Sequence, residues 1–89
     1  MKSVVTVIGK DKIGIISKVT TVLSENKVNI LDISQTIMQD YFTMIMIVDL
    51  AGMEIAFNDL KERLDGLEAE IGVSVKIQHE DLFNAMHKL

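Results

Sequence analysis

The chain has 89 residues, of which 48% are hydrophobic and only 4% aromatic, and 13 acidic against 9 basic residues give a formal net charge of −4. The acidic balance and the scarcity of aromatic residues argue against a nucleic-acid binder, which needs a basic face and stacking platforms. The absence of Cys excludes disulfide scaffolds and thiolate metal sites, and it fits the reducing cytoplasm.

The length predicts a single domain with one aliphatic core. The apolar runs are only a few residues long, far short of the roughly 20 residues needed to span a bilayer. The N-terminal residues lead directly into a strand-like run and carry no signal-peptide pattern. We therefore expect a cytoplasmic protein that does not interact with membranes.

The first predicted element is a strand at residues 4–8, which are all β-branched and are followed by Gly9. A helix is predicted next, because apolar residues recur at helical spacing from Ile15 to Leu23. We expect this helix to end near residues 26–27.

Residues 28–38 are strand-like, but their apolar residues change from one parity to the other part-way along. A β-bulge near Ile30 and Leu31 accounts for the change, since one extra residue moves the following side chains to the other face. A hairpin turn is predicted at residues 39–41, and a second long strand at residues 42–50.

A second helix is predicted from the helical spacing of Phe57, Leu60, Leu64, Leu67 and Ile71. Gly66 inside this helix costs it about 1 kcal/mol relative to Ala, and Gly72 is expected to end it in a left-handed conformation. Alternation over residues 73–78 predicts a half-buried strand. A short amphipathic helix is expected from Leu82, Phe83, Met86 and Leu89.

The order β-α-β-β-α-β followed by a terminal helix predicts an α+β, ferredoxin-like fold. Its four-stranded antiparallel sheet has the strand order 4-1-3-2, with both helices on one face. Residues 1–79 form the domain. Residues 80–89 are expected to form an amphipathic helix that packs on the same domain or on a partner subunit.

The two central strands of this sheet are apolar on both faces. In the first strand, Val4, Thr6 and Ile8 share one face and Val5 and Val7 the other; in the third, Ile45 and Ile47 lie opposite the face of Phe42, Met44, Met46, Val48 and Leu50. Because both helices cover only one face, the opposite face is expected to carry an apolar centre with polar margins. Apolar surface of this kind usually marks an interface, so we expect a homodimer or a higher homo-oligomer. Subunits could associate side by side through an edge strand or back to back through this face, and the terminal helix is a further candidate to cover it.

The loop between the first strand and the first helix is the best candidate for a binding site. Gly9 can take a positive φ, which would let the strand turn sharply away from the sheet, and Asp11 is well placed to cap the helix. Gly14 then falls near the third helical position, where backbone N–H groups at a helix N-terminus suit a carboxylate or another small anion. The alternative is that these residues serve only the turn and the cap.

The pattern Gly9-x-Asp11-x-x-Gly14-Ile15 at the start of a helix, with Val28-Asn29-Ile30 at the start of the next strand, resembles the ACT domain family. The resemblance extends roughly from Lys2 to Gln78. It is closest to free-standing bacterial ACT proteins, including the type related to the glycine-cleavage repressor.

This resemblance implies a regulatory module that binds an amino acid or a related metabolite at a subunit interface, with no cofactor. Its ligand loop would consist of Gly9, Lys10, Asp11, Lys12, Ile13, Gly14 and Ile15, and Asn29 and Ile30 would complete the site from a neighbouring subunit. Backbone amides would hold the ligand carboxylate, while Asp11 or Asn29 would accept from its ammonium. Many members have Arg-Pro where this chain has Lys12-Ile13, and the missing Pro removes a φ angle preset for the helix start.

No other residues form a recognisable chemical site. His79 and His87 lack metal-ligand spacing, so solvated side chains explain them and the neighbouring acids better than a metal site does. No acid–base pair or nucleophile motif is apparent, so we expect no enzyme activity. The competing hypothesis is a protein–protein adaptor that binds no metabolite. A regulated protein partner is compatible with either reading.

Overall fold

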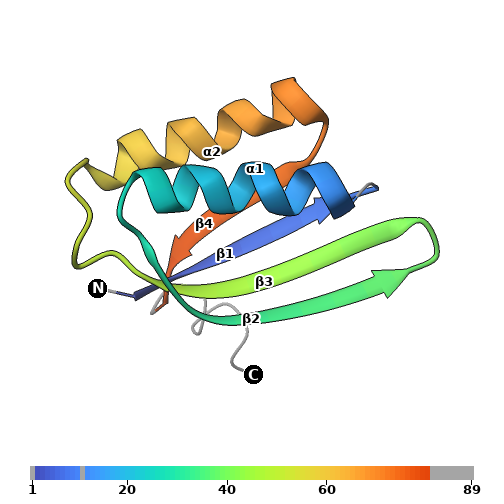
Figure 1. Ribbon diagram of the computed structural model, residues 1–89, viewed down its shortest axis with the longest axis horizontal. Helices are drawn as coiled ribbons and strands as arrows, with labels where there is room; N and C mark the ends of the chain where they lie inside the picture. The colour runs from blue at the N-terminus through green and yellow to red at the C-terminus, as the bar shows by residue number, and fades with distance from the viewer. Residues whose placement is uncertain (1, 11, 81–89) are drawn as a thin grey trace.

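The computed structural model describes residues 2–10 and 12–80 (Figure 1). Asp11 and residues 81–89, which make up most of the terminal helix predicted at residues 80–89, lie outside the described residues. The elements in chain order are β1 (Lys2–Gly9), α1 (Lys12–Glu25), β2 (Asn29–Met38), β3 (Tyr41–Asp49), α2 (Phe57–Ile71) and β4 (Ser74–His79). All six agree with the predicted elements to within a few residues.

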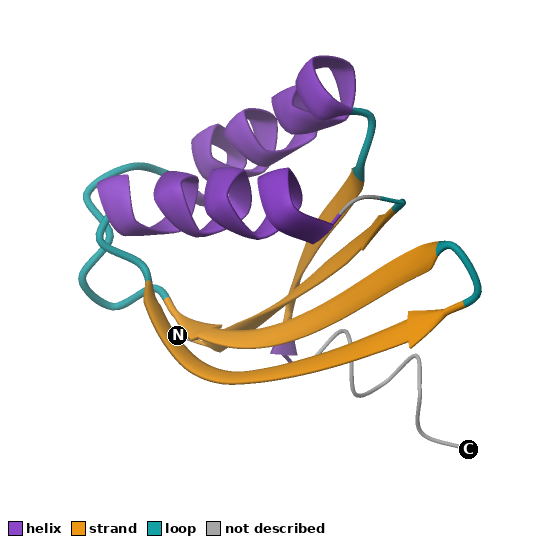
Figure 2. Cartoon of the chain, turned by 45° about the vertical axis from the view of Figure 1, so that its right-hand side comes forward, coloured by secondary structure: helices purple, strands orange, loops and turns teal. Residues whose placement is uncertain are grey.

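The four strands form one antiparallel sheet in the order β2-β3-β1-β4, which is the predicted order read from the other edge. Both helices lie on the same face of this sheet (Figure 2). The predicted α+β, ferredoxin-like fold is therefore confirmed. The predicted bulge is also confirmed, because the register between β2 and β3 shifts between Ile30 and Asp32.

The helices end as their sequences indicate. The backbone N–H of Val28 donates to the carbonyl of Leu23 at 2.9 Å, and Lys27 takes a left-handed φ of 60°. This arrangement satisfies carbonyls that the last turn of α1 would otherwise leave unpaired. Gly72 closes α2 with a φ of 71°, as predicted.

The core lies between the helices and the sheet. Among the described residues, its buried cluster consists of aliphatic and Met side chains and the ring of Phe42, and Phe57 packs against it. Its fully buried members include Val5, Val7, Val19, Leu23, Met44, Met46, Val48, Leu60 and Leu64. No helix in the described part of the chain is long and apolar enough to cross a membrane.

We call the sheet face that points away from the helices the open face. Each cross-strand row on it begins with a polar residue on β4, passes through β1 and β3, and ends with a polar residue on β2. The three rows are Gln78, Val4, Ile47 and Asp32; Lys76, Thr6, Ile45 and Ser34; and Ser74, Ile8, Thr43 and Thr36. In these three rows, the apolar residues belong to the central strands, as predicted.

The strand β2 is exposed on both of its faces, which the sequence analysis did not anticipate. Ile33 and Ile37 lie opposite Met46 and Phe42 and so point to the helix side, yet they are 42% and 61% exposed. The reason is geometric, because α1 and α2 cover the other strands and leave β2 at the uncovered edge (Figure 2). The prediction that the uncovered apolar surface lies on the central strands was therefore incomplete.

Candidate ligand-binding site

The strand β1 ends at Gly9, which lies opposite Phe42 of β3. A Cβ atom at this position would collide with Ile15 and would lie 2.8 Å from Cγ1 of Val73. Gly9 therefore permits the start of α1 and the entry to β4 to pack against the end of β1. The positive φ that Gly9 could adopt is not used, because Gly72 is the only glycine with a positive φ among the described residues.

Gly14, the third residue of α1, differs from Gly9 because no packing requires it. It is exposed, and a Cβ atom built on it would meet nothing within 4 Å. The first turn of α1 contains no acidic side chain among its described residues. Since the first N–H groups of a helix have no partner inside it, an anion can approach them beside Gly14.

The β2–β3 hairpin turn lies beside this loop, at the same end of the sheet (Figure 1). Lys10 Nζ lies 5.7 Å from the centre of the Tyr41 ring, within range of a cation–π interaction. A surface cavity of about 330 Å³ is lined by Lys10 together with Ile37, Gln39, Asp40, Tyr41 and Phe42. The loop and the hairpin thus form one recess.

Sequence reasoning missed the hairpin residues because 27 to 32 positions separate them from Lys10. The residue pairing between the two central strands could have revealed that the hairpin lies beside the loop. Pairing Gly9 with Phe42 places the hairpin turn next to the loop. Only an explicit alignment of these strands would have found it.

The remaining predicted loop residues are placed as follows. Ile15 is 3% exposed and belongs to the core, so its side chain does not face the recess. Lys12 and Ile13 are the first two residues of α1. Asp11, the predicted cap, lies outside the described residues.

Asn29 and Ile30 lie at the opposite end of the sheet from the loop. Asn29 is opposite Asp49 on β3, whereas Gly9 is opposite Phe42 on the same strand. Seven residues of strand separate the two positions, which corresponds to about 23 Å. Within one chain, the structure therefore does not bring these residues to the loop.

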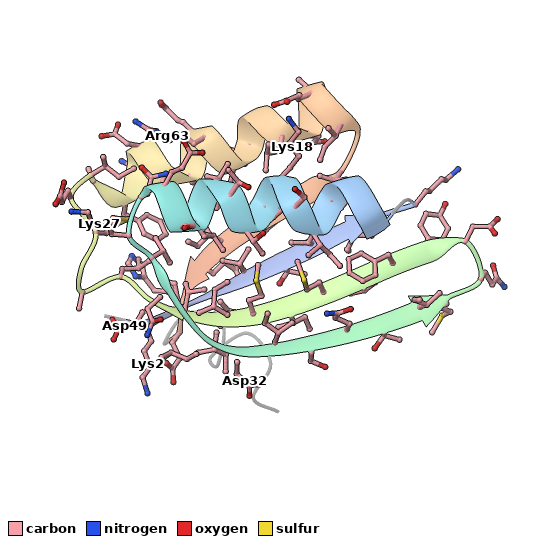
Figure 3. All side chains as sticks on the ribbon, viewed as in Figure 1. Lys2, Lys18, Lys27, Asp32, Asp49 and Arg63 are labelled. Atoms are coloured by element: carbon pink, nitrogen blue, oxygen red, sulfur yellow. The ribbon has the colours of Figure 1, made fainter. Side chains whose placement is uncertain are left out.

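The surroundings of Asn29 are charged. The N–H of Ala51 donates to the Asp49 carboxylate at 2.9 Å. This hydrogen bond holds the pKa of Asp49 below its usual value, and the Lys2 ammonium lowers it further. Lys2, Asp32 and Asp49 gather at this end of the sheet (Figure 3).

The histidine considered for metal binding has a packing role. The ring of His79 stacks on that of Phe57, with 4.4 Å between ring centres. Among the described residues, no group of three or more His, Asp or Glu side chains could hold a metal ion. His87 lies outside the described residues.

The family model of the ACT domain matches residues 3–78 of the chain. This chain belongs to the ACT domain family. A curated relative, a UPF0237 protein of Clostridium acetobutylicum, is 55% identical over 89 residues and aligns along the full length of both chains.

Solved structures of ACT proteins share this fold. The ACT domain protein from Streptococcus pneumoniae has a TM-score of 0.80 and 36% identity, and the match covers 93% of each chain. The regulatory subunit of aspartate kinase from Thermus thermophilus has a TM-score of 0.64 and 26% identity, over 86% of this chain and 50% of that one. A putative glycine cleavage system transcriptional repressor matches with a TM-score of 0.74 and 20% identity, over 86% of this chain and 45% of that one, which shows a common fold.

Proposed function

We propose that this ACT protein is a cytoplasmic regulatory module that binds a small amino acid or a related metabolite at the interface of two subunits. The observation that carries the proposal is the open approach to the start of α1 beside Gly14, where packing leaves room for a ligand. Similarity to the regulatory subunit of aspartate kinase supports a regulatory role. The proposal assigns no reaction to the chain.

The charges around the recess suit the two charged groups of an amino acid. The first N–H groups of α1 and the Lys10 ammonium favour a carboxylate. Asp40 lines the same cavity as Lys10 and offers an acceptor for an ammonium. Ile37, which is 61% exposed, provides apolar surface in the same cavity for a small side chain.

A second subunit would supply Asn29 and Ile30 if the two β2 edges pair antiparallel. In such a pair, the first residue of one β2 lies near the last residue of the other. The first residue of β2 is Asn29, and the last, Met38, adjoins the hairpin turn that lines the recess. Two-fold pairing therefore brings the neighbour's Asn29 to the end of the sheet that carries the loop.

Thermal unfolding in the presence of each of the twenty common amino acids tests this proposal. A ligand that binds only the folded state stabilises it by about 2.7 kcal/mol when its concentration is 100 times Kd. For a domain of this size, each kcal/mol corresponds to roughly 4–8 °C in Tm. At least one amino acid is therefore expected to raise Tm by 10 °C or so at saturation.

Gly14→Val is expected to abolish this shift while leaving Tm without ligand nearly unchanged, because the added side chain occupies the approach to the amides. Gly66→Val is the matched control. Gly66 is also a helical glycine with open space at its Cβ position, and it lies on α2. If no amino acid changes Tm, or if both variants retain the shift equally, the proposal fails.

A second candidate function is a protein–protein adaptor without a metabolite ligand. The apolar residues exposed along β2 favour it, namely Leu31, Ile33, Ile37 and Met38. An adaptor would show no shift with any amino acid. Leu31→Lys would abolish capture of a defined partner through β2, and deletion of the residues after Gln78 would abolish capture through the terminal residues. A metabolite sensor would keep its ligand-induced shift in both variants.

A further inference from the structure

The open face is unevenly buried along β1. Val4 is 4% exposed, whereas Ile8 on the same face is 44% exposed and Ile45 on the neighbouring strand is 38% exposed. Val4 does not belong to the core cluster under the helices. Both helices of the described residues lie on the other side of the sheet (Figure 2), so neither helix accounts for the burial of Val4.

The chain leaves the sheet at the end where Val4 lies. On the strand β4, Gln78 is directly opposite Val4, and the strand ends one residue later at His79. The residues that follow Glu80 therefore start beside the buried end of the open face.

The length and the pattern of residues 81–89 fit this end of the sheet. A helix of nine residues is about 13 Å long, and four strands span about 14 Å. Leu82, Phe83, Met86 and Leu89 recur at helical spacing and would form one apolar stripe, whereas Asn84 would point to the opposite side. The row of Val4 and Ile47 offers the complementary apolar surface.

We propose that residues 81–89 dock across the Val4 end of the open face of their own chain. This cover blocks back-to-back packing of two sheets at that end, and it leaves the β2 edge as the surface for association between subunits. The inference does not depend on the proposed ligand, since it rests on the burial of Val4, the exit of the chain, and the length and apolar pattern of residues 81–89.

Thiol labelling tests this inference, because the chain has no native Cys and each introduced thiol is unique. In the full chain, the thiol of Val4→Cys is expected to react slowly with a maleimide. Adding Phe83→Asp places a charge in the apolar contact, and the labelling rate is expected to rise by about tenfold or more. Asn84→Asp is the matched control, and it is expected to leave the rate unchanged.

Two further positions calibrate the experiment. Ile8→Cys, on the exposed end of the same face, is expected to react fast in every background. Val7→Cys, which is fully buried in the core, is expected to stay protected, which shows that the Phe83→Asp chain is folded. If that control becomes reactive, Leu82→Asp replaces Phe83→Asp in the same comparison.

Three results would overturn the inference. The thiol of Val4→Cys could react as fast as that of Ile8→Cys in the full chain. It could also stay protected both with Phe83→Asp and with Leu82→Asp. Protection could also be lost on 100-fold dilution of the full chain, in which case a second copy covers the face. Protection that is independent of dilution and removed by the stripe variants is the outcome expected.

Discussion

At the scale of single residues, the glycines of this chain differ in the physical reason for which each position needs a glycine. Gly9 is required by packing, since Ile15 and Val73 occupy the space of any side chain there. Gly72 is required by backbone conformation, because its φ of 71° disfavours other residues. Gly14 and Gly66 have neither constraint. A glycine that neither packing nor conformation requires is a candidate for ligand approach when it lies at a helix N-terminus, as Gly14 does.

The two glycines of α2 give a paired prediction about stability. Gly66→Ala is expected to raise the free energy of unfolding by about 1 kcal/mol, because Ala has the higher helix propensity. Gly72→Ala is expected to lower it by about 1 kcal/mol, because Ala is strained at positive φ. Urea denaturation measures both values. Shifts of the same sign would contradict this assignment of roles.

At the scale of elements, two polar contacts connect α1 to α2. On the surface, Lys18 Nζ lies 3.0 Å from Glu70 Oε1, and the other contact, at the end of α1, is partly buried. Asn26 is 8% exposed at the end of α1, and its Nδ2 donates to the carbonyl of Val22 at 2.7 Å. Arg63 of α2 donates from Nη1 to Asn26 Oδ1 at 3.0 Å. The Asn26 side chain therefore pairs with a carbonyl in the last turn of α1 and connects this end of the helix to α2.

Removing this contact is expected to destabilise the fold. Asn26→Ala should lower the free energy of unfolding by about 1–2 kcal/mol, since it removes two hydrogen bonds at a mostly buried site. Asn58→Ala, at an exposed position near the start of α2, is the control and should have little effect. In a double-mutant cycle, Asn26→Ala and Arg63→Ala are expected to be non-additive by about 0.5 kcal/mol or more. Strict additivity would show that the two residues do not interact.

At the scale of elements, some features of the structure could be predicted from the sequence and others could not. The strands, the helices, the bulge after Ile30 and the end of α2 at Gly72 follow from local periodicity and backbone preference, which the sequence carries directly. The Asn26–Arg63 contact and the recess between Lys10 and the hairpin do not, because they depend on which distant segments the register brings together. The exposure of β2 depends on how far the helix layer reaches across the sheet, and side-chain alternation does not report that.

At the scale of the whole molecule, the exposed edge of β2 and the open face are two competing surfaces for association. Ile33 lies near the middle of β2, so a two-fold antiparallel pair of β2 edges brings its two copies close together. Ile45 lies at the centre of the open face instead.

Lysine substitutions at these positions distinguish the two surfaces. Ile33→Lys is expected to shift the protein from dimer to monomer in sedimentation velocity at micromolar concentration, because like charges meet across the edge. Ile45→Lys is expected to leave the dimer intact. The reverse pattern would place the interface on the open face, and a monomeric wild type would contradict association altogether.

The most direct test of a ligand site shared between subunits is complementation between two inactive chains. Gly14→Val removes the loop half of each site, and Asn29→Ala removes the half supplied by the neighbour. Each variant alone is expected to lose binding of the amino acid that stabilises the wild type. After subunit exchange in an equal mixture, half of the dimers are mixed, and each mixed dimer has one intact site, so calorimetry is expected to recover about a quarter of the wild-type binding capacity. Recovery of no binding in the mixture, with dimers demonstrably exchanged, would contradict the shared site.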